Sequence, residues 1–320
     1  MPRISSELSF VDHLGACKAR WAIGRMGFIV PPGLYAIGTP NPESPVVVTA
    51  NYKMTYDIMR KTLSGRHIWL LVLETYGINV WCAAGKGTFG TGEVVRRVTA
   101  SRLADIVSHR RLILPIFGAP GVAAYQVAKR CGFSVSYATI RAADLPEYLD
   151  NGMVTTPAMR QLEFSLYDRM VLIPVEVVLE LKSLVIFSCL VLLACTVAGN
   201  LTAGIVAFGA YAGAVLSGTV LGPLLLPWLP SKSFAIKGAF VGLLWAMSYY
   251  FLTGAAWTLP ELSAAILILP AVSAFYTLNF TGCTTFTSRS GVKKEMKIGL
   301  PAMAIAIAAG IILLSLNAFL

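Results

Sequence analysis

The chain has 320 residues, of which 56% are hydrophobic and 13% charged, with 26 Lys and Arg against 16 Asp and Glu. This composition is too apolar for an ordinary soluble protein, and no run of Lys and Arg alternates with aromatic residues as in a groove that stacks nucleic-acid bases. Residues 1–182 hold 20 Lys and Arg and 14 Asp and Glu, whereas residues 183–320 hold only 6 and 2. The sequence therefore predicts a charged globular half, residues 1–182, followed by a transmembrane half, residues 183–320.

The N-terminal segment and the cysteines indicate the compartment. The first 25 residues contain no cleavable apolar segment, so we expect the globular half to remain in the cytoplasm. Cysteines stand at Cys17, Cys82, Cys131, Cys189, Cys195 and Cys283, without a CxxC pair or a zinc-ligand spacing. This pattern is typical of independent thiols in a reducing compartment. It also predicts that the chain binds no iron–sulfur cluster of its own.

Short β-rich runs alternate with helical stretches between residues 46 and 151, a pattern that indicates a parallel sheet with helices on its faces. Strands are expected at 46–49, 68–74, 112–115 and 134–137, and helices at 52–63, 93–107, 122–130 and 145–151. In open α/β sheets, ligands bind beyond the carboxyl ends of the strands. We therefore expect a binding site built from the loops that follow the strands, at residues 50–53, 75–77 and 118–121.

The segment 79–92 (NVWCAAGKGTFGTG) is rich in glycine and contains Cys82. Gly85, Gly87 and Gly90 have the spacing of a dinucleotide-binding turn, but about ten residues separate them from the preceding strand, whereas that fingerprint starts at the strand end. A phosphate-binding P-loop is excluded because residue 80 is valine and no Ser or Thr follows Lys86. On the residues alone, Cys82 as an inert buried thiol stays open, since that is the usual role of a lone cysteine.

Nine consecutive residues, 79–87 (NVWCAAGKG), resemble the signature of the mercury-methylating corrinoid protein family (the HgcA type). Segments 32–35, 48–53, 118–122, 141–144 and 279–295 resemble the large subunit of the corrinoid iron–sulfur protein of acetyl-CoA synthesis. The resemblance implies an α/β Rossmann-like corrinoid-binding domain followed by an all-α transmembrane domain. It places Cys82 on a short cap helix, as the lower axial thiolate of the cobalt in a base-off, cobalamin-type corrinoid. A histidine ligand is not expected, because no histidine stands in an Asp-x-His-x-x-Gly motif.

The strand-end loops and the resemblance together give the expected cofactor contacts. Besides Cys82, these are Thr49, Asn51, Thr75, Tyr76, Asn79, Val80, Trp81, Ala83, Ala84, Gly85, Lys86, Gly87, Thr88, Phe89, Gly90, Gly118, Ala119, Pro120 and Gly121. The backbone N–H groups of residues 85–92 are expected to approach the nucleotide tail closely, because glycine permits it. Lys86 is expected either to pair with the phosphate of that tail or to be a solvated surface charge. The cobalt charge and the N-terminus of the cap helix are expected to lower the pKa of Cys82.

The activity implied by the resemblance is corrinoid-dependent methyl transfer from methyl-Co(III) to inorganic Hg(II), which forms methylmercury. A thiolate below cobalt donates charge and favours a carbanion-like or radical methyl group. The implied partners are a methyl-tetrahydrofolate-linked donor, an Hg(II)-thiolate substrate and a two-cluster [4Fe-4S] ferredoxin as reductant. One alternative is a corrinoid methyl carrier of acetyl-CoA and one-carbon metabolism without mercury as its substrate. A second alternative is a membrane transporter or sensor with a nucleotide-binding domain.

Five apolar segments in the C-terminal half are long enough to cross a bilayer. They lie near 183–199, 202–225, 236–256, 262–281 and 298–318, and the methylating family also has a five-span tail. Lysines lie between the second and third spans and between the fourth and fifth. The positive-inside rule then predicts an inner-membrane protein with a cytoplasmic N-terminal domain and an outside C-terminus. The near absence of ionisable residues within the spans favours an anchor over a transport path.

The connection between the fourth and fifth spans, residues 279–288, is dense in hydroxyl groups. One interpretation is a capped re-entry loop, in which Ser288 or Ser290 and Glu295 cap the last helix. The other is a surface that docks on the cofactor domain. The role of Cys283 within this loop stays open.

Overall fold

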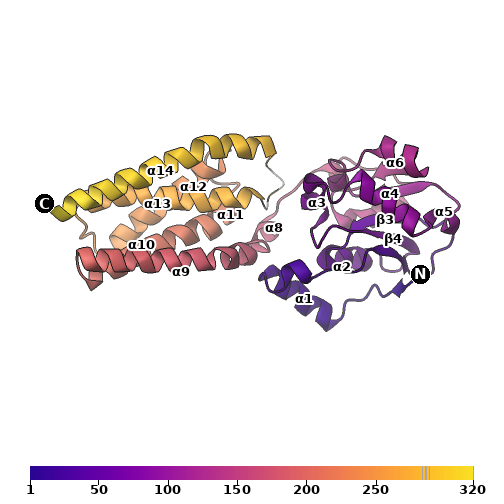
Figure 1. Ribbon diagram of the computed structural model, residues 1–320, viewed down its shortest axis with the longest axis horizontal. Coiled ribbons are helices and arrows are strands. Elements are labelled where there is room, and N and C mark those ends of the chain that lie inside the picture. The colour runs from indigo at the N-terminus through magenta and orange to yellow at the C-terminus, as the bar shows by residue number, and fades with distance from the viewer. Residues whose placement is uncertain (283, 285–286, 288, 320) are drawn as a thin grey trace. The chain divides into compact units, whose positions relative to one another are not determined.

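The computed structural model describes residues 1–282, 284, 287 and 289–319. It forms two compact units, Met1–Glu163 and Phe164–Leu320 (Figure 1). The boundary expected between residues 182 and 183 falls inside α9 (Ile173–Ala198). The reason is that the last charged residues before the apolar segment, Glu180 and Lys182, lie within that helix and do not mark its beginning.

The first unit is built on a six-stranded sheet with the order β1-β2-β4-β3-β5-β6. The strands are β1 (Arg3–Ile4), β2 (Gly33–Ile37), β3 (Val46–Ala50), β4 (Ile68–Leu73), β5 (Arg111–Leu114) and β6 (Ser134–Tyr137). β2 runs antiparallel to β4, and the other neighbouring strands are parallel. The four expected strands are confirmed as β3 to β6. The expectation of a purely parallel sheet was wrong, because β2 makes the sheet mixed.

The helices of the first unit are α1 (Phe10–Arg20), α2 (Lys53–Thr62), α3 (Val80–Lys86), α4 (Thr91–Ala100), α5 (Leu103–Ile106), α6 (Ala124–Cys131) and α7 (Leu145–Asp150). Short 3-10 turns include η1 (Arg25–Gly27) and η2 (Ile116–Gly118). The single helix expected at 93–107 is two helices, because Arg102 takes a left-handed conformation with φ 48° between them. The pattern of apolar residues did not predict α1, whereas the resemblance implied a cap helix where α3 lies.

Both faces of the sheet are covered, because side chains alternate along the strands. In β4, Trp69, Leu71 and Leu73 belong to one core, together with side chains of α3, α4 and α6. The alternate residues of β4 belong to a second core with side chains of α2 and α7. The helix after β3 therefore covers one face, and the helices after β4 and β5 cover the other. Such a reversal at the carboxyl edge of a sheet is where α/β proteins bind ligands.

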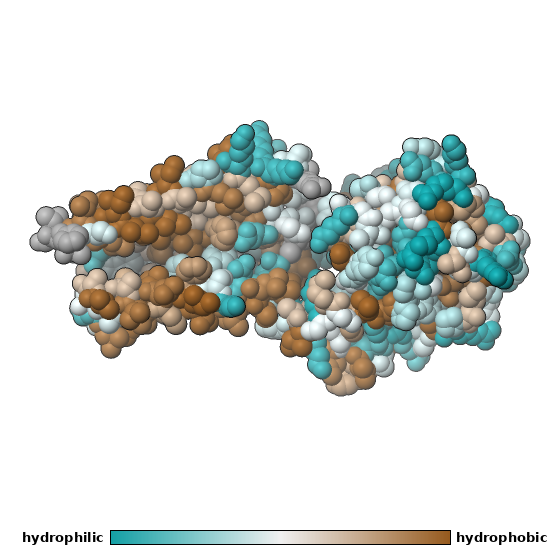
Figure 2. Space-filling model, viewed as in Figure 1, coloured by the Kyte–Doolittle hydropathy of each residue, from teal (hydrophilic) through white to brown (hydrophobic). Residues whose placement is uncertain are grey.

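The second unit is helical. Its helices are α8 (Leu166–Met170), α9, α10 (Leu201–Leu216), α11 (Gly222–Leu225), α12 (Phe234–Leu252), α13 (Leu259–Asn279) and α14 (Arg289–Phe319). Within the described residues, five helical segments are long and apolar enough to cross a membrane: Leu166–Ala198, Leu201–Leu225, Phe234–Leu252, Leu259–Gly282 and Ser290–Leu316. Hydrophobic side chains cover much of the surface of these helices in Figure 2. The number of apolar helices agrees with the prediction, and the segments begin earlier than expected.

Small residues let the apolar helices pack closely. A Cβ atom at Gly213 would collide with the ring of Trp245, and one at Gly242 would lie 2.7 Å from Cα of Pro270. Glu295, expected with Ser288 or Ser290 to cap the last helix, accepts hydrogen bonds at the start of α12, from Ser233 Oγ at 2.5 Å and from the backbone N–H of Ala235 at 2.7 Å. The cap of the last helix stays a prediction, because residue 288 lies outside the described residues.

Four positions of the hydroxyl-rich connection, residues 283, 285, 286 and 288, lie outside the described residues. The expectations for Cys283, for Ser288 and for the docking role of the loop therefore stay predictions.

Candidate functional site

Cys82 lies on α3, a helix of seven residues that follows β4. The Oδ1 atom of Asn79 accepts a hydrogen bond from the backbone N–H of Cys82 at 3.0 Å and caps the helix N-terminus. Val80 and Ala83 are buried in the core, whereas Cys82 is half-buried. The helix ends at Gly87, whose φ of 83° favours glycine. Local sequence and core packing thus hold the Cys82 side chain on the outward side of α3.

Asn51 joins the end of β3 to the loop that follows β4. It is fully buried, and its Oδ1 atom accepts hydrogen bonds from the backbone N–H groups of Thr75 and Gly77 at 3.0 and 3.2 Å. Its side-chain amide donates to Glu74 at 2.7 Å. Two of the expected site loops therefore meet through one amide. Because both ends of that amide are bonded within the protein, Asn51 shapes the edge of the sheet.

The loop after β5 packs against the glycine-rich segment. The backbone N–H of Thr91 donates to the carbonyl of Gly121 at 3.1 Å, and the rings of Trp81 and Phe117 meet edge to face with centroids 5.2 Å apart. A Cβ atom at Gly121 would collide with the carbonyl oxygen of Phe89. Glycine is required at position 121 because the two backbones approach so closely. All three expected loops thus converge at the carboxyl edge of the sheet.

The expected contact residues differ in their exposure. Tyr76, Gly85, Lys86, Gly87, Ala119 and Pro120 are exposed, and Asn79, Trp81, Cys82, Thr88 and Gly121 are half-buried. The remaining ones are buried: Thr49, Asn51, Thr75, Val80, Ala83, Ala84, Phe89, Gly90 and Gly118. The buried side chains face the protein interior, so they support the edge and do not present side chains at its surface.

The charges near Cys82 oppose the effect of its burial. Burial raises the pKa of the Cys82 thiol, and the positive charges of Lys86 and Arg25 act in the other direction. Among the groups of the chain itself, burial is the larger effect on the pKa of Cys82. The lowering expected from the cobalt charge together with the helix N-terminus stays a prediction. The sequence did not single out Arg25, whose guanidinium donates to the carbonyl of Ala19 at 3.2 Å and lies over the Tyr52 ring.

Glu93 is a second residue that the sequence did not single out. It lies in the first turn of α4 and accepts a hydrogen bond from the backbone N–H of Glu74 at 2.9 Å. It also pairs with Arg97 at 2.9 Å. Burial alone would raise the pKa of Glu93, but these hydrogen bonds hold it below its usual value. Glu93 thus fixes the loop after β4 to α4, and an acid near a helix N-terminus was the available signal.

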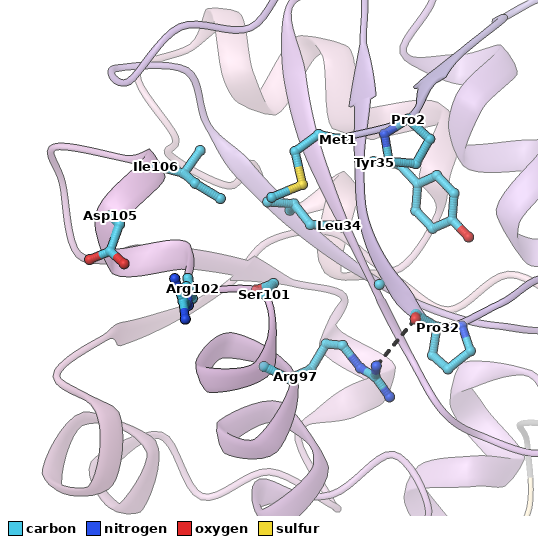
Figure 3. A pocket seen from close by; sticks show the side chains of 12 residues that line it. Met1, Pro2, Pro32, Leu34, Tyr35, Arg97, Ser101, Arg102, Asp105 and Ile106 are labelled. Carbon is cyan, nitrogen blue, oxygen red and sulfur yellow. Dashed lines mark hydrogen bonds between the residues drawn. The ribbon is translucent and has the colours of Figure 1, made fainter.

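A cavity of about 710 Å³ lies elsewhere in the first unit, between β2, α4 and α5. Figure 3 shows Arg97 donating to the carbonyl of Pro32 at its rim, at 3.2 Å. Neither Cys82 nor any other expected contact residue lines this cavity.

The comparison with family models concerns the first unit. Residues 24–136 match the family model of the CO dehydrogenase/acetyl-CoA synthase delta subunit. The acetyl-CoA decarbonylase/synthase complex subunit gamma of Methanopyrus kandleri is 38% identical over 124 residues, which are 38% of this chain and 26% of that protein. The subunits gamma of Archaeoglobus fulgidus and Methanocaldococcus jannaschii are 36% identical over 88 residues and 35% identical over 92 residues. These matches cover 27% and 28% of this chain and 19% of each relative.

The chain therefore spans about a quarter or less of the length of these relatives. The family match includes β2 to β5, the whole of α3 and all of β6 except Tyr137, and it ends before the helical unit. The similarity to acetyl-CoA synthesis subunits, expected from short segments, is confirmed over this range.

Proposed function

We propose that the chain is a membrane-anchored corrinoid protein that methylates inorganic Hg(II), with Cys82 as the lower axial thiolate of cobalt. One observation carries the proposal. The Cys82 side chain is half-buried on a short capped helix at the carboxyl edge of the sheet, where the loops after β3, β4 and β5 converge. The signature at residues 79–87 supports the mercury-methylating type, and the match over residues 24–136 supports a relation to acetyl-CoA synthesis proteins.

A single protein ligand, Cys82, fits a metal whose other ligands belong to its cofactor. Within the described residues, no group of three or more His, Cys, Asp or Glu side chains is placed to hold a metal ion. A single thiolate is then suited to an axial position, because a corrin ring supplies the equatorial nitrogen ligands. When bound, the corrinoid supplies a cobalt that carries the methyl group, and a thiolate ligand favours its release to an electrophile such as Hg(II).

The residues of the chain have separate roles in this proposal. Asn79 positions the Cys82 backbone through its cap hydrogen bond. Lys86 and Arg25 favour the thiolate electrostatically and partly offset the cost of its burial. Gly85 and Gly87 are exposed and carry no side chain, so a phosphate-bearing tail can approach this end of α3. The backbone N–H of Gly87 is not available to that tail, because it donates to the carbonyl of Ala84 at 3.2 Å. Lys86 is exposed beside these glycines and is the proposed cation for that phosphate.

The apolar helices support a membrane anchor. Five described segments have the required length and hydropathy, and the lysines between them favour an inner-membrane protein with the first unit in the cytoplasm and the C-terminus outside. The proposed partners are a two-cluster [4Fe-4S] ferredoxin as reductant and a methyl-tetrahydrofolate-linked donor. Anchoring near the same membrane would raise their effective concentration.

A second candidate function is a corrinoid methyl carrier of one-carbon metabolism that does not use mercury. The observation in its favour is that the similar proteins are subunits of acetyl-CoA decarbonylase/synthase complexes. The signature at residues 79–87 and the apolar helical unit favour the first candidate, because the family match ends at residue 136 and does not extend into the helical unit.

Variants of the full-length protein test the proposal. Cys82→Ala should abolish methylmercury formation and remove the sulfur-ligated corrinoid absorption bands. Cys131→Ala is the matched control, since Cys131 is also a half-buried free thiol, and it should change neither readout. Cys82→His should retain corrinoid but lose mercury methylation, because imidazole donates less charge than a thiolate.

The outcomes separate the candidates. Methylmercury formation by Cys82→Ala at the wild-type rate would refute the axial role. Corrinoid bands in the wild-type protein without methylmercury formation would favour the methyl carrier. A protein that binds no corrinoid would refute both and leave the transporter or sensor.

A further inference from the structure

Helix α1 presents a stripe of apolar side chains to solvent. Phe10, Leu14, Cys17 and Trp21 recur at positions i, i+4, i+7 and i+11, which lie on one face of a helix. Phe10 is 78% exposed, Leu14 41% and Trp21 48%, and Cys17 is also exposed. Figure 2 shows hydrophobic side chains at the surface over α1. We call these four residues the α1 stripe.

The opposite face of α1 is fixed to the body of the first unit. Asp12 accepts from Lys53 at 2.6 Å and from Arg60 at 2.7 Å. Ala19 is fully buried, and a Cβ atom at Gly15 would lie 2.6 Å from the Phe28 ring. Rotation of α1 to bury the α1 stripe would break both ion pairs and move small residues out of a tight contact. The fold therefore determines that the apolar face points outward.

The charge beside the α1 stripe is positive. Lys18 is exposed on a border of this face, whereas Asp12, the one carboxylate of α1, is engaged on the inner face. Aromatic and aliphatic side chains bordered by cations are typical of helices that lie in the interface of an anionic bilayer. Lipid phosphates are negative and attract such cations. Aromatic rings such as that of Trp are enriched at the level of the lipid headgroups.

The connection between the first unit and the first apolar helical segment is short. The first unit ends at Glu163, and the first helical segment that is apolar enough to cross a membrane begins at Leu166. So short a connection keeps the first unit close to any membrane into which that segment inserts.

We propose that the α1 stripe docks on the anionic surface of the membrane that anchors the chain. Phe10, Leu14 and Trp21 enter the headgroup region, and Lys18 pairs with lipid phosphates. Docking adds a second attachment and restricts the orientation of the first unit at the membrane. The proposal rests on the membrane placement proposed above, so the experiment tests that placement separately.

Photo-crosslinking of the full chain tests this docking. The protein is reconstituted in bilayers of phosphatidylcholine containing about one-third phosphatidylglycerol, with a benzophenone amino acid in place of Phe10. The matched control carries the same group in place of Tyr125, an aromatic residue on α6 that is 72% exposed. A third sample carries it in place of Phe208, on the apolar helix α10. Mass spectrometry then identifies lipid or protein adducts.

We expect the yield of lipid adduct at position 10 to be at least about fivefold higher than at position 125, and Lys18→Glu to lower it by about fivefold. Equal yields at positions 10 and 125, or an adduct at position 10 with protein, would overturn the docking. Absence of lipid adduct at position 208 would refute the membrane placement itself, and the docking with it. An adduct at position 208 but none at position 10 would overturn the docking and leave the anchor intact.

Discussion

Replacement of Asn79 tests how the fold positions Cys82. Asn79 accepts the hydrogen bond from the backbone N–H of Cys82 at 3.0 Å and is the N-cap of α3. A helix of seven residues is not stable in isolation, so α3 depends on this cap and on the burial of Val80 and Ala83. Asn79→Ala removes the cap and leaves the core side chains in place.

The free-energy cost of Asn79→Ala can be worked out from the loss of the N-cap hydrogen bond. Loss of an N-cap side chain costs about 0.5–2 kcal/mol, typically about 1 kcal/mol. A loss of about 1 kcal/mol makes local opening of α3 about fivefold more frequent, because about 1.4 kcal/mol corresponds to a tenfold change. The two cores of the first unit do not contain Asn79. The free energy of global unfolding should therefore fall by no more than the cost of the cap, about 0.5–2 kcal/mol.

Amide hydrogen exchange measures the local effect, since exchange reports opening of individual segments. In Asn79→Ala, a peptide that covers α3 should exchange about fivefold faster than in the wild-type protein. Asn79→Ser retains an oxygen acceptor and should stay within about twofold of the wild-type rate. A peptide from α6, a helix of eight residues without a side-chain cap, is the internal control and should not change. Unchanged exchange in α3, or equally faster exchange in α3 and α6, would contradict the positioning role of Asn79.

Three further predictions concern stability. Asn51→Ala should destabilise the first unit by about 1–3 kcal/mol in chemical unfolding, because the buried backbone N–H of Thr75 loses its acceptor. Burial alone would raise the pKa of Asp12, but hydrogen bonds from Lys53 and its neighbours hold it well below its usual value. Asp12 therefore stabilises the fold above about pH 4 and loses this contribution as the pH falls; the difference in unfolding free energy between wild type and Asp12→Asn should shrink in acid. Gly242→Ala should lower the thermal midpoint in detergent, because the new Cβ atom would meet backbone of α13 at 2.7 Å.

The central part of the fold could be predicted because its strands are buried on both faces. All six residues of β4 and all five of β3 are buried, which produces the continuous apolar runs typical of parallel strands. β2 has only five residues and β1 only two, so neither shows a clear period. The antiparallel direction of β2 depends on its pairing with β4, and no local pattern encodes that pairing.

The orientation of helix α1 could not be predicted from the sequence, for a different reason. Its apolar residues face solvent and its carboxylate faces the protein, the reverse of the usual surface helix. The partners of Asp12 are Lys53 and Arg60, which lie 41 and 48 positions away in the sequence. A periodic pattern can show that such a helix has two faces, but it does not show which face packs on the body.

The candidate site could be located from its nine-residue signature, whereas the roles within the signature could not. Val80, Ala83 and Ala84 are buried, whereas Trp81 and Cys82 are half-buried. All five of these residues belong to α3. A consecutive motif does not distinguish side chains that pack from side chains that meet a ligand. The approach of Arg25 to Cys82 depends on the tertiary fold, so sequence spacing gave no signal for it.

Comparison of two cysteines addresses the alternative that Cys82 is an inert structural thiol. Cys131 is half-buried in α6, packs against the first core and donates its thiol hydrogen to the carbonyl of Val127 at 3.3 Å. This is the usual environment of a structural cysteine. Cys82 is equally half-buried, but within the described part of the chain its sulfur makes no hydrogen bond, and Lys86 and Arg25 act on it electrostatically. Reactive and metal-binding thiols occupy electropositive, partly exposed positions of this kind, which supports Cys82, and not Cys131, as the ligand of a metal.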